Sequence, residues 1–286
     1  MISTDTYFGI GKTHEVCQDY ARCGVAPDGK AYALVSDGCS SSPDTDFGSR
    51  LLTMAAVHQR NLFPEAPLDP HWAIWRAFSM VQSPLTPACL DATLLGITET
   101  QDGVRVSIAG DGVVCARNRA TGLMRIWDFD FRGAPGYPSY LLDARRLVNY
   151  RREGFGDRIV RICQEEKPGD FIQEEGEEGL FGPSGGDSNE DGFDGVAARL
   201  TFSSFEWDLV MIASDGVHSF QRNDNLQSVP MLDVLWNLMA IKSFTGQFVS
   251  RRCRAFEKFC IKEGWHHNDD LGVAAAYMLD TPGAQD

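Results

Sequence analysis

Two stretches far apart in the sequence share one pattern, an apolar run that ends in serine, aspartate and glycine. In the first, Ala31–Ser36 leads into Asp37, and in the second Trp207–Ala213 leads through a serine into Asp215. Residues with strand propensity before a glycine turn predict a buried strand with a carboxylate at its mouth. Carboxylates that converge favour a bound cation, and hard divalent cations take oxygen ligands. The repeated pattern therefore predicts a metal site.

Other acids at predicted strand ends extend this set: Asp19, Asp111, and either Asp269 or Asp270. For any single member, the simpler interpretation is an Asp that only helps to make a turn. The repeated context favours a cation site, because apolar strands have no room for an unpaired charge. Since these acids are spread along nearly the whole chain, we expect one domain, residues 1–280, to bring them together.

The first two acids are positioned by a predicted hairpin. Tyr20–Val25 is a short strand that turns at Pro27-Asp-Gly29 into the strand that begins at Ala31. Antiparallel strands joined by a short turn lie side by side. Asp19, at the start of one strand, is therefore expected beside Asp37, at the end of the other.

Further elements follow from periodicity and turn residues. The other strands are expected at Ser3–Ile10, Ala92–Thr98, Gly103–Ala109, Gly112–Arg117, Gly122–Phe129, Val196–Ser203, Asp208–Ala213 and Leu271–Met278. Helical spacing predicts helices over Ser49–Asn61, Asp69–Val81, Met231–Ile241 and Thr245–Glu263. From Pro135 to Gly156 we expect a loop with a short helix around Asp143–Tyr150.

A glycine-rich, strongly acidic segment lies at about residues 165–195 and is most marked from Asp170 onward. It is too poor in apolar residues for a core strand, so it is predicted to be a mobile surface flap. Residues 281–286 are expected to form a disordered tail.

Two patterns imitate metal sites of other kinds. Asp187–Gly192 fits the first half of a calcium-binding EF-hand loop, but Ala198 stands at the twelfth position, where a bidentate glutamate is needed. His266 and His267 lie close to Asp269, but adjacent side chains point apart and do not make a zinc site. Neither an EF-hand nor a zinc site is expected.

Composition excludes several classes of function. The 286 residues carry a formal net charge of −14, whereas binding to a nucleic-acid backbone needs clustered Lys and Arg. Solubility alone accounts for most of this charge. Without a signal-type or membrane-length apolar run, we expect a soluble cytoplasmic protein with no membrane partner. The eight cysteines form no Cys-x-x-Cys pair, which disfavours zinc ribbons and disulfide frameworks.

Taken in order, the motifs resemble the metal-dependent Ser/Thr protein phosphatases of type 2C, over about residues 7–278. The resemblance is carried by Gln-Asp19, the strand that ends in Asp37-Gly, Thr93 in Asp-Ala-Thr-Leu-Leu, Ala-Gly-Asp111, Ala-Ser-Asp215-Gly and Asn-Asp269-Asp-Leu-Gly-Val. Each motif is weak alone, and their common order makes the signal specific. The first loop, with His followed by Cys-Gln-Asp, is closest to a bacterial branch.

This resemblance implies an α+β fold, a four-layer α/β/β/α sandwich of two packed antiparallel sheets flanked by helices. It also implies two Mg²⁺ or Mn²⁺ ions, with a third in some members, and a bridging hydroxide that attacks phosphate in line. By position, Asp37 would bridge the first two metals, and the carbonyl of Gly38 would bind one of them. Asp215 and Asp269 would hold the other, and Asp19 would act through bound water. Asp111 together with Asp215 would bind the third metal.

Two positions depart from the family pattern. Where an Arg usually clamps the phosphate, five residues before Asp19, this chain has His14. An imidazolium offers fewer donors than a guanidinium, so phosphate binding is expected to be weaker or to use Lys12 or Arg50. Cys39 replaces a His that many eukaryotic members carry as a candidate acid. We hypothesise that His14 binds phosphate or transfers a proton; the alternative is that it only orders the loop.

The expected activity is hydrolysis of phosphoserine and phosphothreonine in a phosphorylated protein, with a cognate Ser/Thr kinase as a further partner. Two alternatives stay open. Loss of the usual Arg favours a pseudophosphatase that binds phosphoprotein without turnover, whereas retention of the metal carboxylates opposes it. The second alternative is a hydrolase of small phosphoesters.

Overall fold

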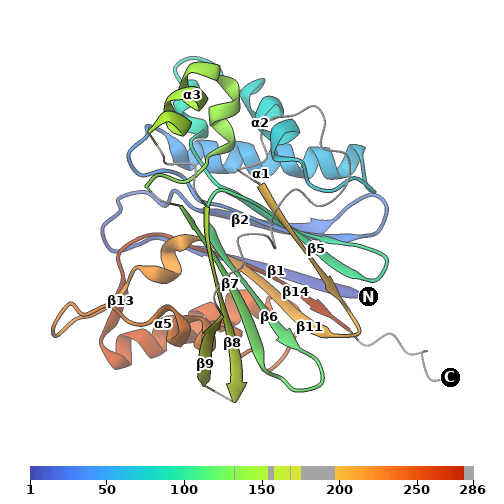
Figure 1. Cartoon of the computed structure of the whole chain (residues 1–286), viewed down its shortest axis with the longest axis vertical. Coiled ribbons are helices and arrows are strands. Elements are labelled where there is room, and N and C mark those ends of the chain that lie inside the picture. The colour runs from blue at the N-terminus through green and yellow to red at the C-terminus, as the bar shows by residue number, and fades with distance from the viewer. Residues whose placement is uncertain (132, 154–157, 168, 175–196, 280–286) are drawn as a thin grey trace.

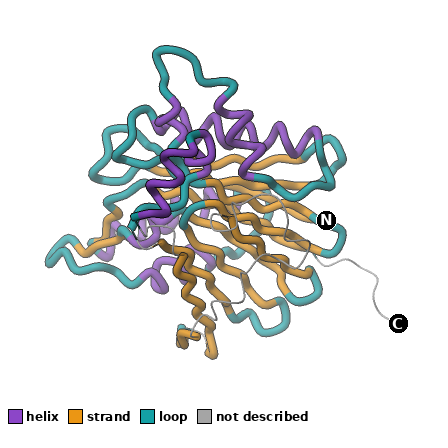
Figure 2. Tube along the Cα trace, turned by 45° about the horizontal axis from the view of Figure 1, so that its top comes forward, coloured by secondary structure: helices purple, strands orange, loops and turns teal. Residues whose placement is uncertain are grey.

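The computed structural model describes residues 1–131, 133–153, 158–167, 169–174 and 197–279. Two antiparallel sheets pack face to face, and helices lie on both sides of the strands (Figure 1, Figure 2). This is the four-layer α/β/β/α sandwich expected from the sequence, and the predicted α+β fold class is confirmed.

The larger sheet has the strand order β1-β14-β11-β6-β7-β8-β9 among the described residues, and all neighbouring pairs are antiparallel. Its strands are β1 (Ile2–Gly9), β6 (Gly112–Asn118), β7 (Met124–Phe131), β8 (Arg158–Lys167), β9 (Asp170–Glu174), β11 (Trp207–Ala213) and β14 (Leu271–Met278). The two strands that lead to Asp215 and away from Asp269 are therefore direct neighbours, β11 and β14.

The smaller sheet has the order β10-β5-β4-β3-β2, again antiparallel. Its strands are β2 (Tyr20–Val25), β3 (Ala31–Ser36), β4 (Leu94–Glu99), β5 (Gly103–Ala109) and β10 (Ala197–Ser203). Every residue of β3 is buried, because Leu34 faces the helices and Val35 faces the other sheet. A strand covered on both faces reads as a continuous apolar run.

Helices cover the outer face of each sheet. On the smaller sheet, Leu52 of α1 (Thr45–Leu62) and Ile74 of α2 (Pro70–Phe78) pack with Leu34. On the larger sheet, residues of α4 (Met231–Met239) and α5 (Phe248–Glu263) pack on the side chains of β11. A short helix, α3 (Ala144–Arg152), lies near α2 (Figure 1). None of the described helices is long and apolar enough to cross a membrane.

The sequence prediction is wrong for residues 165–174, where the start of an acidic surface flap was expected, and no strand was predicted for residues 158–164. These residues form the antiparallel strands β8 and β9. The acidic composition suggested an exposed segment, but Glu165 is buried. Its carboxylate accepts hydrogen bonds from the backbone N–H groups of Met124 and Gly169, at 2.9 and 2.5 Å. A buried carboxylate satisfied by backbone donors is compatible with a strand. Residues 175–196 of the predicted flap, the EF-hand-like stretch and residues 281–286 lie outside the described residues.

Short elements near the strand ends were not predicted either. In the described part of the chain they are three 3₁₀ helices, η1 (Pro87–Leu90), η2 (Pro138–Leu142) and η3 (Asp215–His218), and a two-stranded sheet of β12 (Phe220–Arg222) and β13 (Trp265–His267). Elements of three to five residues are too short for a periodic sequence signal. The other predicted strands and helices are present, with shifted ends such as Thr45 for the start of α1.

Candidate functional site

The hairpin of β2 and β3 holds the first two predicted acids. Tyr20 pairs with Ser36, so Asp19 and Asp37 extend from the same end of the hairpin. Their carboxyl groups lie against each other, close enough to share a proton. The sequence expectation for this pair is met in position.

The other three acids come from connections at the same end of the two sheets. Asp215 follows the end of β11, and Asp111 lies in the tight connection between β5 and β6. The carboxyl group of Asp37 reaches that of Asp215 and is also repelled by Asp111. Asp269, just before β14, is repelled by Asp215 in turn. The structure thus brings together all five predicted carboxylates; we call Asp19, Asp37, Asp111, Asp215 and Asp269 the carboxylate cluster.

Burial makes the charges of this cluster costly. Burial first, and then the charges of neighbouring carboxylates, raise the pKa of Asp19 to about 7 and that of Asp111 to about 8. The same causes raise the pKa of Asp37 well above its ordinary value. Among the described residues, no three His, Cys, Asp or Glu side chains are already arranged as ligands of one metal ion. The acids are close in pairs, and each pair needs a proton or a cation between its members.

Asp19 is positioned by the other sheet. The Ser214 hydroxyl donates to Asp19 Oδ2 at 2.6 Å and accepts from the Gly272 N–H at 2.9 Å. The other oxygen, Asp19 Oδ1, is buried and has no hydrogen-bond partner among the described residues. A buried carboxylate oxygen without a donor is a suitable ligand for a cation or a bound water.

Asp37 is positioned through its backbone by Thr93. The Thr93 N–H donates to the Asp37 carbonyl at 2.8 Å, and the Asp37 N–H donates to Thr93 Oγ1 at 3.1 Å. Gly38 is closely packed, because a Cβ there would lie 2.8 Å from the carbonyl oxygen of Thr45. Thr93 and Ser214 both belong to motifs noted in the sequence. Their hydrogen bonds to Asp37 and Asp19 could be recognised only from the structure.

Asp269 and Asp270 have different surroundings. Asp270 is buried, and its two oxygens accept from the backbone N–H groups of Gly11 and Gln18 at 2.7 and 2.5 Å. Asp270 therefore fastens the first loop to the last strand. Asp269 is 44% exposed and faces Asp215, so it is the member available to the cluster.

His14 lies at the edge of the cluster with a carboxylate on each side. Its Nδ1 is 3.0 Å from Asp270 Oδ2 and its Nε2 is 3.5 Å from Asp269 Oδ1. Burial opposes protonation, but the two carboxylates outweigh it and raise the pKa of His14. Of the cations expected to assist it, Arg50 lies over the ring of Tyr20 at 5.0 Å, and Lys12 lies near His266.

The remaining candidates have local partners. Cys39 Sγ is 3.1 Å from Ser41 Oγ; burial acts to raise the pKa of this thiol, but hydrogen bonds from hydroxyl groups lower it overall. The Nδ1 of His266 contacts Asn223, and that of His267 contacts the backbone carbonyl of Asp269. The two histidines therefore do not converge, in agreement with the expectation that they form no zinc site.

A second group of charges, which the sequence did not indicate, lies next to the cluster. His218 Nε2 is 3.0 Å from Asp128 Oδ1, and the guanidinium of Arg161 is 2.9 Å from Asp128 Oδ2. The same guanidinium also contacts Asp130, at 3.0 Å. His218 interacts electrostatically with Asp111 and Asp215 of the cluster.

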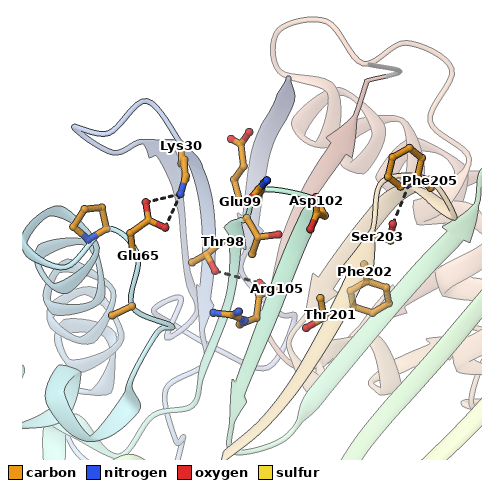
Figure 3. A pocket seen from close by; sticks show the side chains of 14 residues that line it. Lys30, Glu65, Thr98, Glu99, Asp102, Arg105, Thr201, Phe202, Ser203 and Phe205 are labelled. Carbon is orange, nitrogen blue, oxygen red and sulfur yellow. Dashed lines mark hydrogen bonds and ion pairs between the residues drawn. The ribbon is translucent and has the colours of Figure 1, made fainter. Parts of the chain in front are cut away.

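One cavity lies away from these residues. A cavity of about 780 Å³ opens between the β4–β5 turn, β10 and the α1–α2 connection, with Lys30, Glu65, Arg105 and Phe205 in its wall (Figure 3). It sits at the opposite ends of β3 and β5 from Asp37 and Asp111. Its Lys30 is already paired with both oxygens of Glu65, at 2.7 and 2.9 Å. The cavity is therefore separate from the carboxylate cluster.

The raised pKa values predict how stability depends on pH. When a chelator keeps the protein free of metal, Asp19 and Asp111 retain protons in the folded state. The same side chains in the unfolded chain release their protons above about pH 4. Because the folded state then binds more protons, the free energy of unfolding should fall as pH rises from about 4 to about 8, by more than about 1.4 kcal/mol, the equivalent of one pKa unit. Urea unfolding at several pH values measures this.

The control for this prediction is Asp111→Asn, which removes one of the titrating groups and should make the pH dependence shallower. Asp28 and Asp128, whose pKa values are lowered, act only below about pH 4 and do not reverse the sign. A free energy of unfolding that rises over this range would contradict the raised pKa values of Asp19 and Asp111.

Comparison with known proteins gives one sequence match and many structural ones. Residues 11–130 match the family described as Protein phosphatase 2C. A bacterial serine phosphatase superposes with a TM-score of 0.55 at 10% identity, covering 99% of this chain and 100% of that one. A serine/threonine phosphatase of S. agalactiae superposes with a TM-score of 0.54 at 10% identity, covering 98% and 100%. No curated protein matches the sequence. The resemblance indicated by the motifs is confirmed, and the structural likeness establishes the fold.

Proposed function

We propose that this chain, which resembles the type 2C protein phosphatases in its sequence motifs and its fold, is a metal-dependent phosphatase of phosphoserine and phosphothreonine in proteins. The observation that carries the proposal is the convergence of five carboxylates from distant parts of the chain at one end of the sandwich. Clustered, partly buried carboxylates are costly without cations, and paired divalent cations suit hydrolysis of phosphate esters.

The residues present fit a metal site. Carboxylate pairs in mutual contact and the unpartnered Asp19 Oδ1 both call for positive charge. In the proposed site, Asp37, the carbonyl of Gly38, Asp215 and Asp269 would hold Mg²⁺ or Mn²⁺. Asp19 would act through water, and Asp111 would serve a third, weaker position. When bound, such ions lower the pKa of water and neutralise phosphate charge.

The protein's own residues prepare this site. Ser214 fixes one oxygen of Asp19, which leaves the other directed into the cluster. Thr93 fixes the backbone at Asp37, so that its side chain projects from the strand end. Asp270 holds the first loop closed over this end by its bonds to backbone N–H groups. Preorganised supports of this kind hold the ligands of a metal in position.

For His14 we propose a role in phosphate binding. Its raised pKa favours a positive charge at the edge of the cluster, where the phosphate of a substrate would lie. Both of its ring nitrogens already face carboxylates, so the geometry supports a fixed charge better than proton transfer. Of the two roles considered for His14, its surroundings therefore favour phosphate binding over proton transfer.

The substrate class and the cell compartment are also proposals. A half-exposed Asp269 beside half-buried His14 leaves the cluster accessible to a phosphorylated side chain on a protein, for which a Ser/Thr kinase would be the opposing enzyme. All eight cysteines are free thiols, which fits a reducing compartment such as the cytoplasm. The pseudophosphatase alternative is supported by the carboxylates that occupy both nitrogens of His14.

The test is phosphate release from phosphoserine and phosphothreonine peptides and from p-nitrophenyl phosphate, in Mn²⁺, in Mg²⁺ and in a chelator. The proposal expects turnover of the peptides that requires metal. Hydrolysis of the aryl ester alone would favour a small-phosphoester hydrolase. Peptide binding without release, measured by fluorescence anisotropy in Mn²⁺, would identify a pseudophosphatase. Calorimetric titration with Mn²⁺ checks metal binding independently of activity.

A further inference from the structure

The group of charges beside the cluster is arranged around His218. Residues Asp215–His218 form the 3₁₀ helix η3, and in a 3₁₀ helix residues three apart lie on the same side, about 6 Å apart along the axis. His218 therefore stands one turn beyond Asp215 on the same face of η3. Its electrostatic interactions with Asp215 and Asp111 agree with this placement.

The imidazole is held from behind by a buried carboxylate. Asp128 of β7 is 2% exposed, and its Oδ1 lies 3.0 Å from His218 Nε2. Its second oxygen accepts from Arg161 of β8 at 2.9 Å. Since Asp128 fixes Nε2, the other nitrogen, Nδ1, lies on the far side of the ring, where no hydrogen bond to a described residue is found. The side chain of His218 is 38% exposed, so a substrate can reach it.

We propose that His218, oriented by Asp128, is the proton donor to the leaving oxygen of the substrate. In the step, hydroxide forms a bond to phosphorus while the bond from phosphorus to the serine or threonine oxygen breaks, with its electron pair going to that oxygen. The proton on Nδ1 passes to the same oxygen and gives the free alcohol. Neutral His218 then takes a proton from water, which supplies the next hydroxide. This assignment rests on the proposed phosphatase function.

The position needs such a donor, because a serine alkoxide is a poor leaving group without a proton. Cys39, which stands where other members carry a candidate acid, is held in a hydroxyl network with Ser41. His14 has carboxylates at both nitrogens. Among the described histidines near the cluster, His218 is the one with a fixed nitrogen on one side and an accessible nitrogen on the other. A carboxylate behind an imidazole is the usual way to orient a catalytic histidine.

The charges around His218 come from four elements, and most favour its protonated form. Asp128 and Asp130 lie on β7, Asp215 on η3 and Asp111 in the β5–β6 connection, whereas Arg161 on β8 opposes the positive charge. Arg161 is itself neutralised by Asp128 and Asp130. The surroundings therefore favour the protonated ring, and no carboxylate among the described residues accepts a hydrogen bond from Nδ1.

The experiment compares His218→Asn with the wild-type enzyme on two substrates in Mn²⁺, a phosphoserine peptide and p-nitrophenyl phosphate. A general acid contributes about 10²–10⁴-fold when the leaving group needs a proton. We expect kcat for the peptide to fall by about 10²-fold or more, and to fall at least about 30 times more than kcat for the aryl ester, whose phenolate leaves without a proton. Asp128→Asn should likewise lower kcat for the peptide more than kcat for the aryl ester.

The matched control is His266→Asn, a partly exposed histidine that contacts Asn223 and should leave both activities unchanged. Equal losses of His218→Asn on both substrates would assign the residue a structural role and overturn the proposal, as would no loss at all. If thermal unfolding shows that His218→Asn does not fold, the same comparison of kcat for the two substrates is made with His218→Gln and Asp128→Asn, and those variants test the proposal. Failure of the wild-type protein to release phosphate would instead overturn the proposed function.

Discussion

Asp37→Asn is expected to lower kcat for a phosphoserine peptide by about 10³-fold or more, because metal assistance is worth several kcal/mol and each 1.36 kcal/mol is tenfold. Asp37 touches both neighbouring carboxylates of the cluster, Asp19 and Asp215, so it is the member best placed to act on two ions. An amide keeps the shape of the side chain and removes its charge. Steady-state phosphate release in saturating Mn²⁺ measures the loss.

The same substitution should raise thermal stability when no metal is bound. Burial and the neighbouring charges raise the pKa of Asp37, which means that its ionised form is disfavoured in the folded state at neutral pH. Asp37→Asn should therefore melt at a higher temperature than wild type in a chelator. In Mn²⁺ the order should reverse, because a ligand that binds only the folded state stabilises it.

The control is Asp224→Asn, an exposed aspartate in a turn, which should alter neither activity nor melting temperature. Loss of activity together with a lower melting temperature in the chelator would mean that Asp37 supports the fold rather than a cation. Full activity of Asp37→Asn would exclude the proposed site altogether. Activity and stability therefore test the assignment independently.

The members of the carboxylate cluster could be found from sequence because they lie next to recognisable signals, the ends of apolar runs and glycine turns. Asp37 and Asp215 end continuous apolar runs, and such runs are the strands that are covered on both faces. Glycines next to Asp111 make its turn visible as well. The fold followed for the same reason, since alternating or continuous apolar strands separated by turn residues define the sheets.

Other parts of the site carry no such mark. His218, Asp128 and Arg161 come from three elements, and their meeting depends on the pairing of β7 with β8, in which Asp128 is opposite Arg161. The strand β8 was itself missed, because its charged residues hide its buried face. The distinction between Asp269 and Asp270 also needed coordinates, since it depends on which carboxylate the N–H groups of the first loop reach.

Gly216→Ala should disrupt both the fold near η3 and the activity. A Cβ at this position would lie 1.8 Å from the backbone carbonyl oxygen of Asp270 and 2.9 Å from its carbon. Backbone atoms cannot rotate away, so the turn after β11 must separate from the connection before β14. Overpacking of this kind costs about 1–3 kcal/mol, and here we expect about 3 kcal/mol, or a melting temperature lower by about 6 °C.

The effect on activity should be larger than stability alone implies. Separation of the two connections moves Asp215 away from Asp269, and a misplacement of about 1 Å can cost about 10²-fold in rate. We expect kcat to fall by this factor in folded Gly216→Ala, and the affinity for Mn²⁺ to fall with it. Gly122→Ala is the control: nothing lies within 4 Å of its Cβ, and its φ of +72° should cost only about 1–2 kcal/mol without loss of activity. If Gly216→Ala bound Mn²⁺ and turned over substrate as Gly122→Ala does, the close approach of these two connections would not be what aligns Asp215 with Asp269.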